Sequence, residues 1–131
     1  MNKYFLTCVA CILLSTQACS ESYLCIPDRA TGFGFNKYQK SWVPLVFNVE
    51  QKILLKKTDR GWEWSEFGSK YGKLCGEMNE FGGLRCDLFF GEVLFNKNSL
   101  RYLETYIAGY VSGEDNNDNT PSITIGRCTP F

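Results

Sequence analysis

The chain contains no histidine, and this absence removes much of the chemistry by which small proteins act as enzymes. Ser-His and Cys-His nucleophiles, histidine general bases and histidine-ligated zinc all require an imidazole. Carboxylates remain, because two carboxyl groups about 5 to 10 Å apart in a cleft can hydrolyse a glycosidic bond. The acidic side chains considered for such a pair are Glu63, Glu66, Glu77, Glu80 and Asp87. A strand would place Glu63 and Glu66 on opposite faces, so we assign no catalytic residues and favour a protein that is not an enzyme.

Four cysteines remain once the N-terminal segment is set aside, and their number predicts two disulfides. An even cysteine count in a small exported chain is typical of a disulfide framework, and four cysteines allow three pairings. We favour Cys75–Cys86, which closes a local glycine-containing excursion, and Cys25–Cys128, which joins the two ends of the domain. These cysteines lack the Cys-x-x-Cys spacing of a zinc site, so we expect neither a metal nor a cofactor.

Residues 1–20 have the pattern of a secretory signal peptide. Lys3 precedes an apolar run at residues 4–14, which is too short for a membrane-spanning helix of about 20 residues. Cleavage before Glu21 would release a secreted or periplasmic domain, which we favour. Cleavage before Cys19 would leave that cysteine for lipid attachment and a membrane anchor. A buried N-terminal helix is the alternative, but no capping residue supports it. We therefore expect an exported protein whose residues 21–131 form one domain.

Charge argues against a nucleic-acid partner. The whole chain has 14 basic and 14 acidic side chains, and loss of Lys3 with the signal peptide leaves 13 basic ones and a formal charge of −1. A nucleic-acid-binding protein usually carries a basic excess. The partner is then expected to be a protein or a small molecule, and the domain a monomer.

The local patterns are those of short strands and turns. Pro44 cannot donate to a strand ladder, which places its segment at a sheet edge or a bulge. Residues 52–57 and 62–67, joined by a turn at residues 58–61, form the clearest hairpin. Residues 100–111 fit either a helix or a strand, and their β-branched and aromatic content favours the strand. Strands are expected at residues 32–36, 41–48, 52–57, 62–67, 84–90, 92–95, 100–111 and 122–126. About eight strands at this spacing predict an all-β antiparallel meander, closed into a small barrel or packed as a sandwich.

Aromatic side chains are numerous enough to line a ligand pocket. Small barrels can hold a ligand among their inward-facing side chains. The residues considered for such a pocket are Trp62, Trp64, Phe89, Tyr102, Tyr106 and Tyr110. A carrier of small apolar molecules is therefore one hypothesis, although buried aromatic residues more commonly pack into the core.

A polar loop at residues 112–121 is the candidate surface for a protein partner. The candidate contact residues are Ser112, Gly113, Glu114, Asp115 and Asp118. The loop is rich in oxygen ligands, but an EF-hand loop counted from Asp115 would need glycine in place of Thr120 and glutamate in place of Gly126. We expect a solvated loop without a metal ion.

Several short segments resemble a recurrent group of small exported bacterial proteins. They are Tyr23-Leu24-Cys25-Ile26-Pro27, Thr31-Gly32-Phe33, Glu66-Phe67-Gly68-Ser69, Leu100-Arg101-Tyr102, Gly109-Tyr110-Val111, Asn117-Asp118-Asn119-Thr120-Pro121 and Ile125-Gly126-Arg127-Cys128. This resemblance implies export and a shared fold, and no particular activity. The chain also resembles the periplasmic and lipoprotein inhibitors of C-type lysozyme, which are small β-barrels with a cysteine near each end. Their inhibitory loop has a Ser-Gly pair followed by tyrosine, whereas Glu114 follows Ser112-Gly113 here, so only the architecture is implied.

Binding is the function that these features favour. The leading hypothesis is an exported, non-enzymatic binding or inhibitor-like module that acts through loops such as residues 112–121. A small apolar-ligand carrier is the second hypothesis, and a carboxylate-dependent hydrolase is the third.

Overall fold

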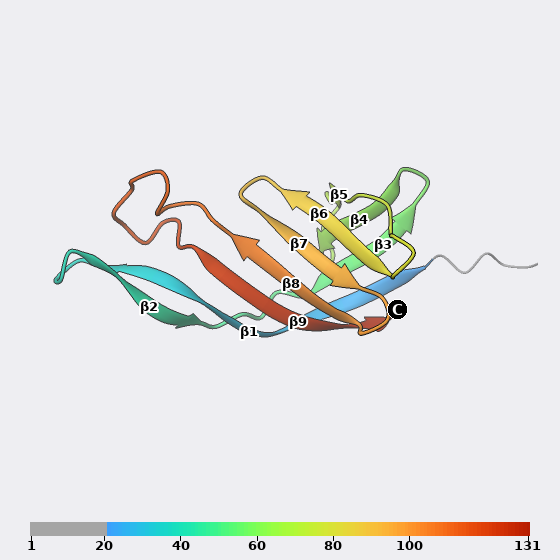
Figure 1. The fold of residues 1–131 in the computed structure, drawn as a ribbon, viewed down its shortest axis with the longest axis horizontal. Helices are drawn as coiled ribbons and strands as arrows, with labels where there is room; N and C mark the ends of the chain where they lie inside the picture. The colour runs from blue at the N-terminus through green and yellow to red at the C-terminus, as the bar shows by residue number, and fades with distance from the viewer. Residues whose placement is uncertain (1–20) are drawn as a thin grey trace, which may run out of the picture.

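The computed structural model describes residues 21–131. The predicted signal peptide and the candidate lipidation site Cys19 lie outside these residues. Within them the protein is all-β, with nine antiparallel strands in a nearly closed barrel (Figure 1). The strands are β1 Ser22–Asn36, β2 Ser41–Phe47, β3 Ile53–Thr58, β4 Gly61–Glu66, β5 Lys73–Leu74, β6 Gly83–Leu88, β7 Gly91–Asn96, β8 Arg101–Tyr106 and β9 Ser122–Pro130. This described part contains no helix that is long and apolar enough to cross a membrane.

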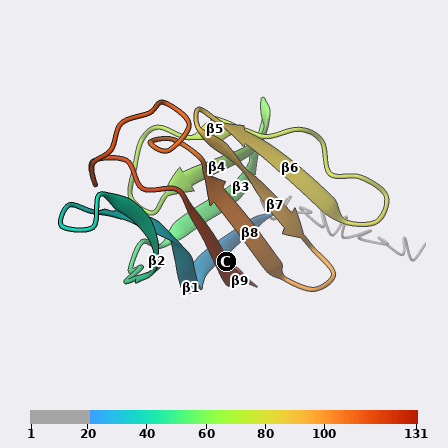
Figure 2. The ribbon, with the colours of Figure 1, turned by 60° about the vertical axis from the view of Figure 1, so that its left-hand side comes forward.

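The first and last strands lie side by side. The strand order is β5-β4-β3-β1-β9-β8-β7-β6, with β2 attached to β1 outside this path (Figure 2). Cys25 of β1 and Cys128 of β9 are direct register partners and form a disulfide. This predicted pairing is confirmed, and it links the two ends of the domain.

The barrel closes at a seam between β5 and β6. Cys75 and Cys86 form the second predicted disulfide across this seam. Next to it, Gly76 N donates a hydrogen bond of 2.9 Å to Arg85 O. The sequence was compatible with either a barrel or a sandwich. The contacts across this seam show that the sheet forms a nearly closed barrel.

Apolar residues at alternate strand positions fill the barrel, because successive side chains of a strand point to opposite faces of the sheet. On β7, Val93 and Phe95 are buried while Leu94 between them is exposed. The buried cluster consists of Tyr23, Cys25, Ile53, Leu55, Trp62, Trp64, Leu84, Cys86, Val93, Phe95, Tyr102 and Cys128. The ring centroids of Trp64 and Tyr102 lie 5.2 Å apart, so aromatic packing occupies the middle of this core.

The predicted hairpin at residues 52–67 is confirmed as β3 and β4. Thr58 and Gly61 pair at its turn, and the Thr58 hydroxyl donates to Gly61 O at 2.9 Å. Gly61 has a φ of 116°, which glycine adopts at little cost because it has no Cβ. The strands predicted on either side of Gly91 are likewise present as β6 and β7.

The segment at residues 100–111 forms a shorter strand than predicted. β8 ends at Tyr106, and the chain turns over the next residues. Gly109 has a φ of 95°, and a Cβ there would lie 1.7 Å from Asn119 O, because the chain folds back closely on itself. The predicted strand at residues 100–111 is therefore correct up to Tyr106 and wrong beyond it.

β1 is much longer than the strand predicted at residues 32–36. Its first half pairs with β3 and β9 in the barrel. Its second half pairs with β2, where Ala30 lies opposite Phe47 at one end and Asn36 lies opposite Ser41 at the other. We call this two-stranded extension, residues 30–47, the arm; it projects past the barrel in Figure 1. Among the described strands β2 pairs with β1 alone, so Pro44 lies on an edge strand as predicted.

Candidate binding groove

The aromatic residues proposed from the sequence for a ligand pocket do not lie together. Three of them belong to the buried core, namely Trp62, Trp64 and Tyr102. Tyr106 is half-buried, and its hydroxyl donates to Asn119 Oδ1 at 2.7 Å. Tyr110 is in a surface loop, and Phe89 is exposed at the turn between β6 and β7. This arrangement favours core packing over a carrier site inside the barrel.

The loop at residues 107–121 is held against the arm by the side chain of Trp42. The Trp42 indole Nε1 donates to Asp115 Oδ1 at 3.0 Å. Its ring lies 5.7 Å from that of Tyr110 in an edge-to-face arrangement, which is a favourable geometry for two aromatic rings. The arm and the loop, which are far apart in the sequence, therefore form one structural unit.

Asn117 covers the edge of β1 beyond the start of β9. β9 pairs with β1 only as far as Gly32, so the backbone of Phe35 needs another partner on that side. Asn117 Oδ1 accepts a hydrogen bond from Phe35 N at 2.7 Å, and Asn117 Nδ2 donates to Phe35 O at 2.9 Å. Phe33 N, on the same edge, donates to Pro121 O at 3.0 Å. The amide thus takes the place of a strand residue and protects an edge that would otherwise be open to other chains.

An apolar groove lies between the arm and the loop. It has a volume of about 470 Å³ and is lined by Phe33, Trp42, Ile107, Tyr110, Val111 and Pro121. A depression of about 410 Å³ shares Phe33, Ile107 and Pro121 with it and continues to Ile123 of β9. We call the two together the arm groove. Val111 is 82% exposed and Ile107 57% exposed. Contiguous exposed apolar surface of this kind makes the arm groove the candidate binding site.

The loop residues singled out from the sequence follow directly after Val111 of the arm groove. All five are exposed. Asp115 holds Trp42, and the Ser112 hydroxyl donates to Gly109 O at 2.8 Å, so these two side chains stabilise the loop. Glu114 and Asp118 add negative charge beside the groove. The loop therefore has a structural role in shaping the groove in addition to its exposed charges.

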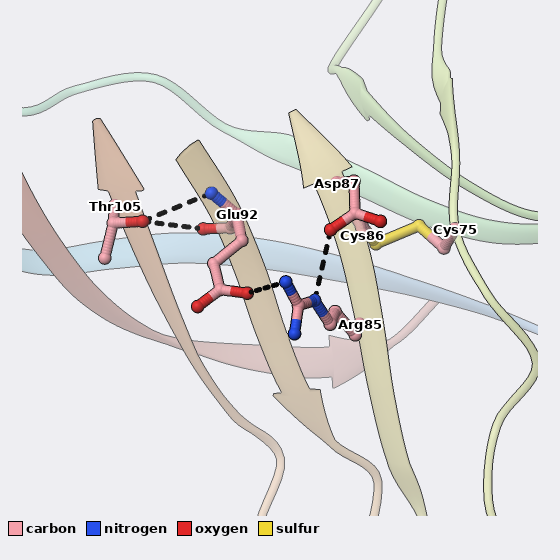
Figure 3. A network of polar contacts seen from close by, with 6 residues as sticks. All are labelled: Cys75, Arg85, Cys86, Asp87, Glu92 and Thr105. Atoms are coloured by element: carbon pink, nitrogen blue, oxygen red, sulfur yellow. Dashed lines mark hydrogen bonds and ion pairs between the residues drawn. A yellow bond between two sulfur atoms is a disulfide. The ribbon is translucent and has the colours of Figure 1, made fainter. Parts of the chain in front are cut away.

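Two of the five acidic residues considered for catalysis, Glu63 and Asp87, take part in ion pairs, and the other three, Glu66, Glu77 and Glu80, are exposed. On the outer face of β6 and β7, the Arg85 guanidinium lies 3.1 Å from Asp87 Oδ1 and 2.9 Å from Glu92 Oε2 (Figure 3). The Asp87 side chain is 80% exposed. Glu63 Oε1 lies 2.6 Å from Arg60 Nη2 in the β3–β4 hairpin. Ion pairs at a protein surface contribute only about 0–1 kcal/mol and are common without any catalytic role.

Glu104 is a perturbed titratable group that sequence reasoning missed. It lies on β8 between Val93 of β7 and Thr124 of β9. It is two positions after the buried Tyr102, so both side chains point to the same face of the sheet. Burial raises the pKa of the Glu104 carboxyl. The alternation Tyr102-Leu103-Glu104 would have revealed that this carboxyl faces inward with the tyrosine.

Sequence reasoning also missed the arm residues that line the groove. Phe33, Trp42 and Ile107 were assigned to three separate predicted strands, at residues 32–36, 41–48 and 100–111. One signal was present: residues 32–35 alternate glycine with phenylalanine, so one strand face carries aromatic rings and the other carries none. The residues that this aromatic face would meet were not visible in the local pattern.

The chemistry of the arm groove is that of a contact surface. It offers apolar side chains and aromatic rings. Among residues 21–131, no group of three or more histidine, cysteine, aspartate or glutamate residues is placed to hold a metal ion. No protein-family model, curated protein or solved structure matches the chain.

Proposed function

We propose that the protein is an exported, non-enzymatic binding module that holds an apolar segment of a protein partner in the arm groove. One observation carries this proposal: six apolar or aromatic side chains from separate parts of the chain line a single groove while several of them stay exposed to water. The two disulfides among the described residues support an oxidising location outside the cytosol.

The groove is held in shape before any partner arrives. Asn117, Asp115 and the backbone of Pro121 all bind the arm through hydrogen bonds. A surface that is already ordered loses less conformational entropy on binding, and this favours affinity. Trp42 and Tyr110 are of the residue types that contribute most to protein interfaces.

The open form of the groove favours a protein segment over a small apolar molecule. Small-molecule sites bury most of the ligand surface in a cleft. The arm groove is instead an elongated depression at the surface, which runs from Val111 to Ile123. An extended or looped segment of a partner can place consecutive apolar side chains along such a surface.

Selection from a random peptide library displayed on phage tests this function. Peptides selected on the disulfide-bonded protein should share apolar or aromatic positions. Their affinities are then measured for the wild type, for Val111→Asp and for the control Val46→Asp. Val46 is as exposed as Val111, at 82%, and does not line the groove.

We expect Val111→Asp to weaken binding at least tenfold, because burying a valine side chain contributes about 1.5–3 kcal/mol. We expect Val46→Asp to change it less than twofold. Equal losses in the two variants, or selected peptides without any apolar pattern, would contradict the proposed function.

A further inference from the structure

Two arginines face each other on the outer surface of β8 and β9. Arg101 of β8 and Arg127 of β9 are direct register partners, so their side chains leave the same face of the sheet, and both are exposed. Like charges directly opposite each other in a sheet are destabilising. Such a pair is therefore a feature that folding alone does not explain.

The neighbouring charges only partly offset this pair. Asp28 accepts two hydrogen bonds of 3.0 Å from the Arg127 guanidinium. This contact holds the pKa of the Asp28 carboxyl below its usual range, and the charges of Arg101 and Arg29 act in the same direction. Within residues 21–131 Arg101 forms no ion pair. The Asp28 carboxylate pairs with Arg127 alone, and Arg101 is left without a neutralising partner among the described residues.

The arginine pair lies in line with the arm groove. The outward-facing side chains of β9 are Ile123, Ile125 and Arg127, and Ile123 already belongs to the groove. Ile125 is 47% exposed and lies beside the arginines in a depression of about 370 Å³. Arg127 lies six positions after Pro121, a distance of about 20 Å along an extended strand. The exposed apolar surface therefore extends about 20 Å from the arm groove along β9 and ends at the two arginines.

We propose that Arg101 and Arg127 bind a carboxylate of the same protein segment that occupies the arm groove. This inference rests on the proposed function. Guanidinium groups bind carboxylates through paired hydrogen bonds, and the exposed isoleucines between groove and arginines suit a peptide better than a lone anion. The partner segment then carries an acidic residue about six positions from its apolar anchor, since an extended peptide covers about 3.3 Å per residue.

The peptide selection described above, repeated on Arg101→Gln, tests this inference. Arg60→Gln is the control, because Arg60 is an exposed arginine at the β3–β4 turn and does not line the depression that holds Arg101 and Arg127. On the wild type we expect aspartate or glutamate to be enriched five to seven positions from the apolar anchor. Arg101→Gln should keep the apolar enrichment and lose the acidic one, and Arg60→Gln should keep both.

Affinities of individual selected peptides then give the coupling free energy between the acidic residue of the peptide and Arg101. Replacing the acidic residue of a selected peptide by its amide should weaken binding about tenfold to the wild type and less than twofold to Arg101→Gln. Unchanged unfolding midpoints of both variants would show that neither result reflects misfolding.

The outcomes separate the inference from the proposed function. Apolar enrichment without acidic enrichment, or acidic enrichment that survives in Arg101→Gln, would overturn the inference and leave the arm groove standing. Selection without an apolar pattern would contradict both. If instead vesicles containing phosphatidylglycerol bind the wild type and not Arg101→Gln, and the peptides show no acidic preference, the arginines serve a lipid headgroup and the peptide inference is wrong.

Discussion

Replacing Asn117 by alanine tests how the arm and the loop are joined. Asn117 makes two hydrogen bonds to the backbone of Phe35, at 2.7 Å and 2.9 Å. A hydrogen bond of this kind contributes about 1 kcal/mol net, so the substitution should loosen this contact by about 2 kcal/mol. Because the Phe35 amide then faces water, its hydrogen exchange should accelerate by about 30-fold.

Amide hydrogen exchange followed by NMR measures this effect, and Phe33 serves as a control within the same molecule. Phe33 N donates to Pro121 O, whereas the Asn117 side chain forms its hydrogen bonds with Phe35. Its exchange should change by less than about threefold, since the effect of the substitution is local. Asn117→Asp keeps the acceptor for Phe35 N and loses the donor to Phe35 O, so its effect should fall between those of wild type and alanine.

The reasoning is refuted if the Phe35 amide exchanges at the wild-type rate in Asn117→Ala. In that case the edge of β1 is protected by something other than the asparagine amide. An equal acceleration at Phe33 would instead show that the whole arm detaches, and the peptide affinity of the arm groove should then fall in parallel.

Three further predictions concern the barrel and the loop. Replacing Cys75 and Cys86 by alanine should lower the free energy of unfolding by about 3 kcal/mol in urea denaturation, because the disulfide closes a short loop with a sequence separation of 11. Burial raises the pKa of Glu104 in the folded state, so the contribution of this carboxyl to stability should be greatest below its unfolded pKa of about 4.3 and be lost as the pH rises through the raised folded value. Glu104→Gln should remove this decline in denaturation curves measured from pH 4 to 8. Gly109→Ala should cost more stability than Gly113→Ala, because both glycines have positive φ but only Gly109 meets a backbone oxygen.

Each of these predictions has a contradicting result. Retention of wild-type stability without the seam disulfide would show that the backbone contact between β5 and β6 suffices to close the barrel. Parallel pH profiles for the wild type and Glu104→Gln would mean that this carboxyl is equally hydrated in the folded and unfolded chains. Equal losses at Gly109 and Gly113 would assign the whole effect to backbone conformation and none to the contact with Asn119.

Local sequence signals predicted most of the barrel correctly. The hairpin at residues 52–67 was evident because alternating strands flank a turn that ends in Gly61. The edge position of Pro44 followed from its missing N–H group. Both cysteine pairings were predicted because a local loop and a closure of the chain ends are the simplest ways to use four cysteines. Each of these features depends on neighbouring residues or on covalent chemistry.

The errors arose where a distant segment overrides the local pattern. Residues 107–111 have the composition of a strand, yet Gly109 packs against Asn119 and the chain turns. Trp62 and Trp64 are aromatic residues that suited either a pocket or a core, and only the packed barrel assigns them to the core. Composition cannot distinguish these cases, because burial depends on which strands become neighbours.

The sequence by itself determined the all-β class, the number of disulfides and most of the turns, since these follow from strand alternation, glycine and proline chemistry and cysteine count. Only the tertiary structure brought together the residues of the proposed binding surface. Phe35 and Asn117 are separated by 82 positions, and their hydrogen bonds bring the arm against the loop. Arg101 and Arg127 become neighbours only through the pairing of β8 with β9. Such contacts join segments that have no local relation, so long-range strand pairing was needed to form both the arm groove and the charged surface beside it.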